Sequence, residues 1–522
     1  MQTEVDSVVT TLDLPRIIYQ KPVSLDQGQC DCACASLPSV VGVRASTRQG
    51  QCDCACTTTS VVCQHLATPL KNTAYLSTMG ESSISIPLGD NYLATLTRDS
   101  GFVVLNQAAF RITKHFEQSR TLEDIPPIWS AVWGKAKVEA MLNEMVFCNL
   151  LLPEDYRESE LIETSTMLTA WLHITDRCNL RCAYCYLPHE KSDMSFQTGQ
   201  AAIAALFRSA VAHNYRVVKL KYAGGEPLMR FPLIKKLHQY AQRLAVQHNL
   251  DLEGVVLSNG TLLTSTMICD MQALGLRLMI SVDGKQNADA CQRPFVNGVS
   301  SSESAIQAVE LALSHNLVPD ISITVSGRNI RNLPKLIAWV LEHNLPFSFN
   351  FYRENDLSAS ATDLQLEEKQ IVGGMLAVFE VIKSNLPHRS LLASLVDRNN
   401  LSIPHLHPCR AGLDYIVFDP QGCVAKCQMD IKNTITDAND SDPLGTIHNS
   451  STGMHNPKVN EKLECTECQW QYWCAGGCPL EAYRTTGHYN TKSPNCSIYR
   501  TLYPEVIRLE GLRLLEHMVA VS

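Results

Sequence analysis

The alternation of strand-like and helix-like segments between residues 171 and 352 constrains the fold of this chain more than any other feature. Six short β-prone runs recur there, separated by stretches with helical periodicity. Such strand–helix repeats predict a parallel sheet, curled or doubly wound, with helices packed against it. Cofactor sites in these folds lie at the carboxyl ends of the strands. We therefore expect the chemistry directly after these runs, which span residues 171–175, 219–223, 254–258, 277–282, 320–325 and 348–352.

Three cysteines follow the first of these runs. The stretch "DRCNLRCAYCY" places Cys178, Cys182 and Cys185 in a C-x3-C-x2-C spacing. Three thiolates on one short loop can bind three irons of a 4Fe-4S cube and leave the fourth iron without a protein ligand. The alternative is a zinc site, but zinc prefers four ligands, usually as two separated pairs. The spacing therefore favours an iron–sulfur cluster with an open coordination position.

This loop resembles the signature of the radical S-adenosylmethionine (SAM) superfamily, and the resemblance spans about residues 170 to 355. In that family SAM chelates the open iron, and one electron splits it to give a 5′-deoxyadenosyl radical that removes a hydrogen atom from the substrate. The resemblance implies an α/β fold with a partial (β/α)6 barrel. It also implies SAM and 4Fe-4S clusters as cofactors and an external electron donor such as flavodoxin or ferredoxin.

Further segments at the strand ends fit the same family. "AGGEP" follows the second strand, where glycines let backbone carbonyls approach the SAM ammonium and a glutamate suits the same group. "LSNGTLLT" after the third strand also fits. In similar enzymes, a serine and an arginine after the fourth strand contact the SAM ribose and carboxylate, and an aromatic residue of the cysteine loop meets adenine. The SAM contacts that the resemblance implies are Tyr184, Gly224, Gly225, Glu226, Ser281 and Arg293.

The region from 408 to 500 is rich in cysteine and poor in long periodic elements. Such a composition requires a bound metal or another crosslink to stabilise its fold. Seven spaced thiols exceed one zinc site and suit two clusters. Their spacing resembles the SPASM extension of radical SAM enzymes. That resemblance implies one auxiliary 4Fe-4S cluster on Cys465, Cys468, Cys474 and Cys496, and another on Cys409, Cys427 and Cys478. The fourth ligand of the second cluster is either Cys423 or an open position that could take a substrate thiolate.

Residues 75–153 show three β-prone runs split by the turn signals "GDN" and "RDSG", followed by helical patterns. This order predicts a small α+β module. It resembles the RiPP recognition element, a PqqD-like domain that captures the leader of a ribosomal precursor peptide as an extra strand. The alternative is a generic winged-helix or capping domain.

The same patterns divide the whole chain. We expect a flexible cysteine-rich extension before the module, a helical linker after the radical SAM core, and a terminal helix after the SPASM domain. The expected domains are 1–74, 75–153, 165–355, 356–407, 408–500 and 501–522.

Composition and the start of the chain narrow the partners and the compartment. The formal net charge of −8 argues against broad, charge-driven binding to nucleic acid. The first residues lack the basic and apolar regions of a secretory signal, and no apolar run is long enough for a membrane span. We therefore expect a cytoplasmic protein that binds neither nucleic acid nor membrane. In that compartment the 21 cysteines favour metal binding or redox chemistry over structural disulfides.

Together these features predict a RiPP-modifying peptide maturase. A leader peptide docks on residues 75–153, the core peptide enters the barrel mouth, and a thioether or carbon–carbon crosslink closes as an auxiliary cluster accepts an electron. One alternative is a sulfatase-maturating enzyme, which typically has an Asp after the thiol equivalent to Cys427, where this chain has Gln428. A second is a non-catalytic iron–sulfur redox sensor. No side chain is assigned as a catalytic acid or base.

The octapeptide "QGQCDCAC" occurs twice, at residues 27–34 and 49–56. In an extended strand its three cysteines would lie on one face, about 7 Å apart. The alternatives are a disordered tail with adventitious metal affinity, a zinc or copper site, and a thioether-forming core peptide fused to its own maturase. The expected partner of the enzyme is a ribosomal precursor peptide, and the third alternative makes this repeat the peptide that is modified.

Overall fold

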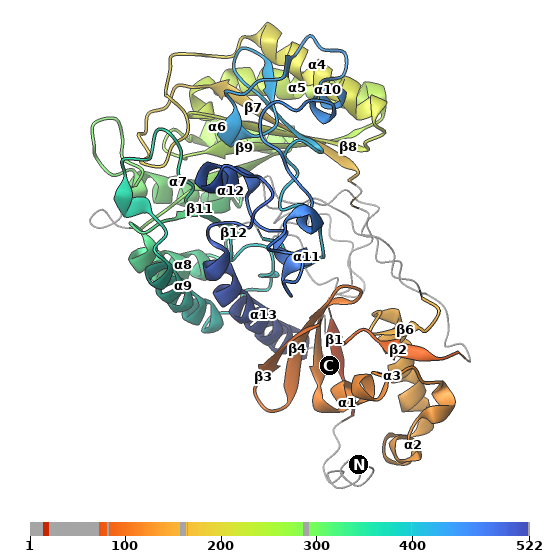
Figure 1. The fold of residues 1–522 in the computed structure, drawn as a ribbon. Coiled ribbons are helices and arrows are strands. Elements are labelled where there is room, and N and C mark those ends of the chain that lie inside the picture. The colour runs from red at the N-terminus through yellow and green to blue at the C-terminus, as the bar shows by residue number, and fades with distance from the viewer. Residues whose placement is uncertain are drawn as a thin grey trace.

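The computed structural model describes residues 14–19, 73–80, 83–156, 163, 165–285, 292–397 and 399–519. The QGQCDCAC repeat lies outside the described residues. Figure 1 shows a large α/β body that contains the central sheet and a smaller module that contains β3 and β4, with α13 running between them. The domain boundaries drawn from the sequence stay a prediction.

The predicted parallel sheet is present, and each predicted run lies within or overlaps one strand. Six parallel neighbours in the order β12-β11-β10-β9-β8-β7 form the curved wall of the large body. They are β7 (Met167–Thr175), β8 (Val217–Gly224), β9 (Asp251–Ser258), β10 (Leu276–Ser281), β11 (Asp320–Val325) and β12 (Phe347–Phe351).

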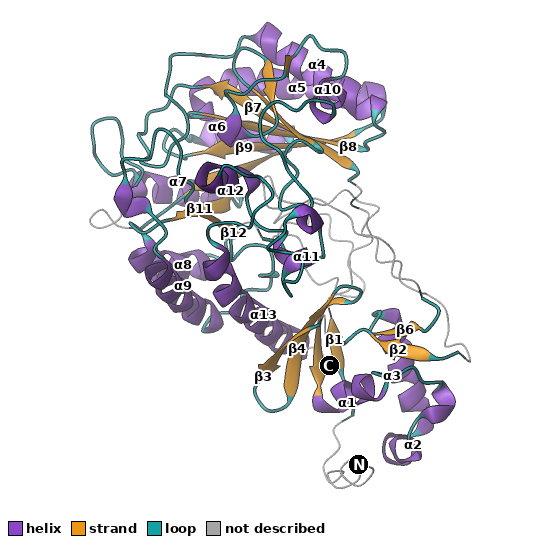
Figure 2. Cartoon of the chain, viewed as in Figure 1, coloured by secondary structure: helices purple, strands orange, loops and turns teal. Residues whose placement is uncertain are grey.

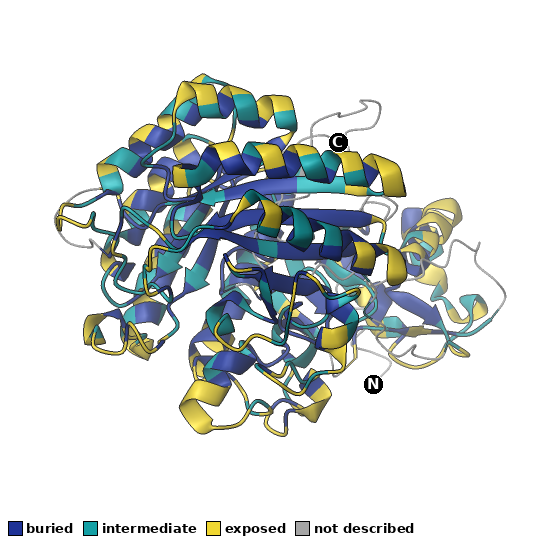
Figure 3. Ribbon diagram, turned by 90° about the horizontal axis from the view of Figure 1, so that it is seen from above, coloured by how far each residue is buried: buried dark blue, intermediate teal, exposed yellow. Residues whose placement is uncertain are grey.

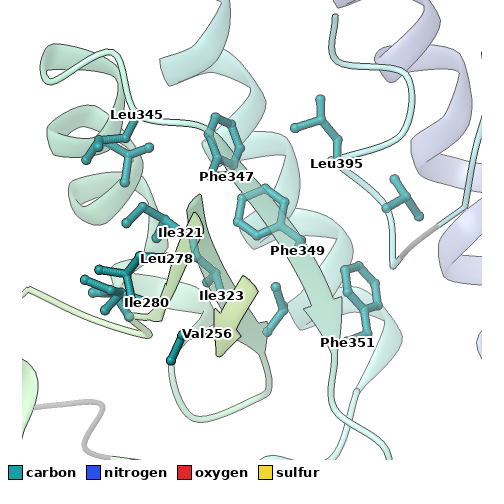
Figure 4. Packing of buried hydrophobic residues seen from close by; sticks show 14 of the residues in the cluster. Val256, Leu278, Ile280, Ile321, Ile323, Leu345, Phe347, Phe349, Phe351 and Leu395 are labelled. Atoms are coloured by element: carbon teal, nitrogen blue, oxygen red, sulfur yellow. The ribbon is translucent and has the colours of Figure 1, made fainter. Parts of the chain in front are cut away.

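Helices cover the outer face of this sheet because alternate residues of each strand are apolar and point that way. In β12, Phe347, Phe349 and Phe351 are buried in the same cluster as Leu395 (Figure 4). Seen from above, the strands are buried while the helices turn exposed faces outward (Figure 3). The helices are α4 (Phe196–Ala212), α5 (Phe231–His248), α6 (Ser265–Leu274), α7 (Ser302–Ser314) and α8 (Leu333–Glu342).

The inner face of the sheet carries polar side chains instead, and ion pairs link its amino-terminal end. Lys219 on β8 lies 3.7 Å from Glu253 on β9. Arg277 on β10 lies 3.6 Å from Glu253 and 3.7 Å from Asp320 on β11. These four charged residues lie on four neighbouring strands, at the amino-terminal end of the barrel. The carboxyl ends of the strands, at the opposite end of the barrel, face the cysteine loop.

The cysteine-rich C-terminal region is less separate than the sequence predicts. Its first strand, β13 (Tyr415–Phe418), is fully buried and pairs in parallel with β7, so the barrel sheet continues into this region. β14 (Cys423–Ala425) and β15 (Thr436–Asp437) extend the sheet antiparallel. Loops predominate around the short helices (Figure 2). These are α10 (Pro443–His448), α11 (Gln471–Cys474) and α12 (Pro479–Thr486).

Of the expected helical linker, α9 (Glu368–Lys383) is the one α-helix among its described residues. The terminal helix α13 (Cys496–Val519) begins earlier than expected and includes a predicted cluster ligand. The short 3-10 turns are η1 (Leu122–Asp124), η2 (Pro227–Arg230), η3 (Ile330–Asn332), η4 (Thr362–Leu364), η5 (Gln428–Asp430) and η6 (Val459–Glu461). Within the described part of the chain, no helix combines the length and apolarity needed to cross a membrane.

The N-terminal module has the predicted order of three strands and then helices. β3 (Ile84–Leu88), β4 (Tyr92–Thr97) and β5 (Gly101–Asn106) form an antiparallel meander. α1 (Gln107–His115), α2 (Pro127–Trp133) and α3 (Lys135–Phe147) follow, and β2 (Tyr75–Ser77) pairs with β6 (Leu151–Pro153). The other face of the sheet packs against α13.

One strand of this sheet lies in the predicted flexible extension. β1 (Ile17–Tyr19) pairs antiparallel with β5, so the sheet order is β1-β5-β4-β3. A three-residue strand carries little periodic signal, which is why the sequence pattern missed it. The unpaired edge of β5 supplies the partner that such a short strand requires.

Candidate active site

The cysteine loop (residues 176–186) follows β7 and is seated against the end of β8. Gly225 N donates a hydrogen bond of 2.7 Å to Thr175 O. A Cβ atom on Gly224 would lie 2.2 Å from Thr175 O, and one on Gly225 would lie 2.2 Å from Arg177 O. Both predicted glycines therefore allow the backbone of the loop to approach β8. Their contact with SAM stays a prediction.

The three thiols of this loop fit a thiolate-bound cluster. Cys178, Cys182 and Cys185 are half-buried. Burial raises the pKa of each thiol, that of Cys182 to about 12, and the neighbouring Cys178 and Cys185 add to this increase. Since thiolates are the ligands, cluster binding must release protons here.

Among the described residues, no three His, Cys, Asp or Glu side chains are close enough to hold a single metal ion. In a 4Fe-4S cube each thiolate binds a different iron, so the ligands stand farther apart than around one ion. The three converging thiols of the cysteine loop would hold such a cube and leave one iron open.

Tyr184 links the cysteine loop to the ends of two other strands. Its hydroxyl donates a hydrogen bond of 2.6 Å to Asp283 Oδ2 and accepts one from Arg293 Nη1. Asp283 Oδ1 accepts a hydrogen bond of 2.7 Å from Thr324 N. Burial raises the pKa of Tyr184 well above its usual value, so the phenol stays protonated. The structure thus brings the predicted Tyr184 and Arg293 together, next to the cysteine loop.

Asp283 was not among the predicted site residues, although it follows the predicted Ser281 by two residues. It is 4% exposed and lies 3.8 Å from Arg293, so its charge is matched within the site. The predicted Ser281 ends β10, is half-buried, and is in register with Ser322 of β11.

The Glu226 carboxylate is directed at the protein rather than at open space. It is fully buried and accepts hydrogen bonds of 2.8 Å from Ser258 Oγ, 2.8 Å from Asn259 N and 3.0 Å from Leu228 N. Asn259 Nδ2 in turn lies 3.9 Å from Cys178 Sγ. Glu226 therefore fixes the loop after β9 beside the cysteine loop, and its contact with the SAM ammonium stays a prediction.

The inner face of β7 lies between the cysteine loop and a second group of predicted cluster ligands. Trp171 Nε1 and His173 Nδ1 are buried and have no hydrogen-bond partner among the described residues. His173 Nε2 lies 3.4 Å from the Tyr186 hydroxyl, and burial lowers the pKa of His173 to about 3, so the imidazole is neutral. Trp171 packs on the same apolar cluster as Tyr415. Three predicted cluster ligands, Cys409, Cys427 and Cys478, pack on that cluster too.

We call these three cysteines the second thiol site. Burial raises the pKa of Cys427 to about 12, and the neighbouring Cys409 and Cys478 thiols add to this increase. Cys423 is not brought to them: it lies on β14, where Asp419 and Asp437 are its charged neighbours. Among the two alternatives for a fourth ligand, the structure therefore does not support Cys423.

The other four predicted cluster ligands, which we call the first thiol site, also lie together. Cys465, Cys468, Cys474 and Cys496 line a single cavity of about 380 Å³. They come from the segment before α11, from α11 itself and from the start of α13. Four thiols around one cavity are the donor set that a fully ligated 4Fe-4S cluster requires.

A buried cation lies between the two thiol sites. Lys462 is 0% exposed, and its ammonium donates hydrogen bonds of 2.9 Å to Ala475 O and 3.4 Å to Gly477 O. These carbonyls belong to the loop from Cys474 of the first site to Cys478 of the second. Burial lowers the pKa of Lys462, and thiols of both sites oppose this decrease. Sequence reasoning missed this residue because a lone lysine has no distinctive spacing.

Residues 172–340 match the Radical SAM superfamily. This match covers less than half of the chain, and together with the likeness to solved structures it confirms the predicted α/β radical SAM fold. The superfamily match also bears out the predictions of SAM and of a 4Fe-4S cluster as cofactors. The N-terminal module lies outside the matched residues, and its PqqD-like character stays a prediction.

Three known proteins illustrate the likeness. The GTP 3′,8-cyclase of Ectopseudomonas mendocina is 31% identical over 185 residues, which are 34% of this chain and 52% of that protein. The serine-type anaerobic sulfatase-maturating enzyme of Klebsiella aerogenes is 20% identical over 352 residues, 63% of this chain and 82% of that protein. An uncharacterised protein of Methanocaldococcus jannaschii is 29% identical over 171 residues, 33% of this chain and 57% of that protein. The chain thus spans little more than half of the M. jannaschii protein and of the cyclase.

Among solved structures, the chain is similar to native anSMEcpe with bound AdoMet and the Cp18Cys peptide. The TM-score is 0.53 at 16% identity, and the match covers 66% of this chain and 99% of that chain. At this identity the likeness shows the fold.

Proposed function

We propose that this protein is a radical SAM enzyme that modifies a peptide and closes a thioether or carbon–carbon crosslink in it. The observation that carries the proposal is the position of β7. Its end leads into the cysteine loop, while Trp171 on its inner face packs with the second thiol site. A substrate held along this strand would face both a radical source and an electron acceptor.

When bound, SAM and its cluster supply a 5′-deoxyadenosyl radical. The chain's own residues would position the cysteine loop and orient the bound SAM. Gly224 and Gly225 allow the cysteine loop to lie against β8, and the Tyr184–Asp283 hydrogen bond ties that loop to β10. Arg293 adds a positive charge that suits the SAM carboxylate.

The inner face of β7 suits a peptide backbone. Two buried ring nitrogens, Trp171 Nε1 and His173 Nδ1, have no partner among the described residues and represent unmet hydrogen-bonding capacity in a low-dielectric space. A neutral His173 can donate to a carbonyl or accept from an amide, depending on its tautomer. A peptide amide in the barrel would satisfy these groups.

The two thiol sites would serve the oxidative half of a crosslinking reaction. After a hydrogen atom and a proton have left, bond closure leaves one electron on the product, and a nearby cluster can accept it. In the second thiol site three cysteines leave room for an open iron, which a substrate thiolate could occupy. The electron that starts each turnover would come from an external flavodoxin or ferredoxin.

A sulfatase-maturating activity is the second candidate, favoured by the similarity to the Klebsiella aerogenes enzyme. The residue after Cys427 argues against it. Gln428 Oε1 accepts a hydrogen bond of 2.8 Å from the Tyr415 hydroxyl, so a neutral amide occupies the place of the family's Asp. An amide cannot accept the proton that a carboxylate at this position would take.

SAM cleavage tests the proposal. We expect the anaerobically reconstituted, reduced protein to form 5′-deoxyadenosine, and Cys182→Ala to form none. Cys269→Ala is the matched control, because Cys269 is an exposed thiol on α6. If the reconstituted protein forms no 5′-deoxyadenosine, the enzyme proposal fails and a redox sensor becomes the better account.

A further inference from the structure

The edge of the N-terminal sheet is occupied by the chain's own first described segment. β1 runs antiparallel to β5, with Ile18 opposite Val104. Asn106 at the end of β5 fixes the start of this segment: its backbone N donates to Arg16 O at 3.2 Å, its Nδ2 donates to Leu14 O at 2.7 Å, and its Oδ1 accepts from Arg16 N at 2.9 Å. Both main-chain and side-chain groups thus recognise residues 14–19.

Apolar contacts add to these hydrogen bonds. Pro15 is buried, Ile17 packs against the core formed by α1 and α3, and Ile18 packs against the main core, which includes residues of α13. A strand added to a sheet edge gains affinity from its backbone and specificity from alternate side chains. Residues 14–19 have both, as a bound peptide would.

The docked strand β1 ends at Tyr19, and the first copy of the repeated cysteine motif begins at Gln27. We call the two copies of QGQCDCAC, at 27–34 and 49–56, the cassettes. Cys30 lies eleven residues beyond Tyr19, a span of at most about 40 Å when extended. After the cassettes the chain returns to the same module at β2, which pairs with β6. The order along the chain is β1, the cysteine-rich segment, the rest of the N-terminal module and then the barrel.

We propose that β1 is an intramolecular leader strand and that the cassettes are the substrate of the enzyme's own radical chemistry. This inference rests on the proposed function and names its substrate. Tethering replaces a bimolecular encounter by a local concentration set by the linker. A leader peptide from another protein would have to displace β1 from the β5 edge.

The reaction we infer is thioether formation within or between the cassettes. One C–H bond and one S–H bond break, and one C–S bond forms. SAM is the oxidant: with one electron from the external donor it gives methionine, and its deoxyadenosyl group takes the hydrogen atom and leaves as 5′-deoxyadenosine. The thiol proton passes to solvent, and the remaining electron passes to an auxiliary cluster. Each crosslink therefore removes two hydrogen atoms from the chain.

Peptide mapping of the full-length chain after turnover tests this. We expect fragments from the cassettes to lose two hydrogen atoms per crosslink and the linked cysteines to resist alkylation. Cys182→Ala should show neither change. If 5′-deoxyadenosine forms while the cassette fragments keep their mass, the substrate assignment is wrong and the proposed function stands. If no 5′-deoxyadenosine forms, the proposed function itself has failed.

The role of β1 needs its own variant. Ile18→Pro removes a backbone donor from the ladder with β5, whereas Ile18→Val keeps the strand. We expect crosslinking to fall on the order of a hundredfold in Ile18→Pro, as a local concentration is lost, while 5′-deoxyadenosine formation persists. Equal crosslinking in the two variants would show that β1 is not a leader.

A mixing experiment separates self-modification from modification of another copy, and it does not depend on the stability of the proline variant. One partner carries Cys182→Ala and intact cassettes. The other has an intact cysteine loop and alanine in place of Cys30, Cys32, Cys34, Cys52, Cys54 and Cys56. We expect little crosslinking in this mixture compared with the wild-type chain. Crosslinking at the wild-type rate would contradict delivery within one chain.

Discussion

The ammonium of Lys462 lies 2.9 Å from the carbonyl oxygen of Ala475, inside the loop that joins the two thiol sites. A Cβ atom on Gly476, the next residue, would lie 2.8 Å from the same nitrogen. The glycine is therefore what lets the cation enter this loop. A positive charge held there faces thiolate ligands of both sites.

Lys462→Met should lower the reduction potentials of clusters bound at both thiol sites. Loss of a buried positive charge destabilises the reduced, more negative cluster. We expect decreases on the order of 60 mV, which is a tenfold change in a one-electron equilibrium. Redox titration followed by electron paramagnetic resonance measures this. Lys458→Met is the control, because Lys458 is exposed nearby, and equal potentials in the two variants would contradict the role of Lys462.

Gly225→Ala should impair cluster binding by the cysteine loop. The new methyl group would lie 2.2 Å from Arg177 O, which is backbone and must move with the loop. We expect reduced iron content after reconstitution and loss of 5′-deoxyadenosine formation. Gly284→Ala is the matched control, since a Cβ there meets no atom of the described residues within 4 Å. Normal iron content in Gly225→Ala would show that the loop tolerates the shift.

Glu226→Gln should destabilise the protein by about 2 kcal/mol, because an amide nitrogen cannot accept the hydrogen bond from Asn259 N. Loss of this hydrogen bond also removes the contact that fixes the loop after β9, so the Asn259 side chain should lose its contact with the Cys178 thiol. Chemical denaturation measures the free energy of unfolding. Glu303→Gln serves for comparison, because Glu303 is exposed on α7, and a similar stability of both variants would disprove the positioning contact.

Stability should fall on acidification through His238. This residue of α5 is buried against Tyr222, and burial lowers the pKa of its imidazole to about 4. The unfolded chain takes up the proton at about pH 6.5, so the neutral folded form loses stability as the pH falls from there toward 4. The loss is about 3 kcal/mol at most.

His238→Gln removes this titration. We expect its melting temperature to depend less on pH between 7 and 4 than that of the wild type. His248→Gln, which alters an exposed histidine at the end of the same helix, should behave as the wild type does. Parallel curves for all three proteins would rule out the burial effect.

Most of the barrel could be predicted from the sequence because its strands are long, buried and regularly spaced. The cysteine loop follows β7 and the two glycines lie at the end of β8, as the strand pattern predicts, because backbone approach and thiol spacing leave a local pattern. Asp283 and Lys462 leave no such local pattern in the sequence. Each matters through partners that are distant in sequence, Tyr184 in one case and Ala475 in the other.

The role of Glu226 shows a different limit. Its residue type suits a ligand ammonium, but the structure uses both of its oxygens for contacts with β9 and η2. Chemistry that fits a ligand also fits the backbone donors of a neighbouring loop. The sequence pattern missed β13 and β1 because strands of four and three residues are too short to show a period. Such strands form where a neighbouring sheet edge offers hydrogen bonds, and no local pattern records that edge.

The packing of α13 against β3 has a consequence for how the chain is made. Arg508 Nη1 donates a hydrogen bond of 3.0 Å to Pro87 O, and Gly511 allows Leu88 to approach the helix. Translation delivers β3 more than four hundred residues before this helix. The sheet that contains β3 therefore keeps an apolar face uncovered until α13 has been synthesised. Final assembly of this module should follow the synthesis of α13, after the predicted cluster ligands have emerged.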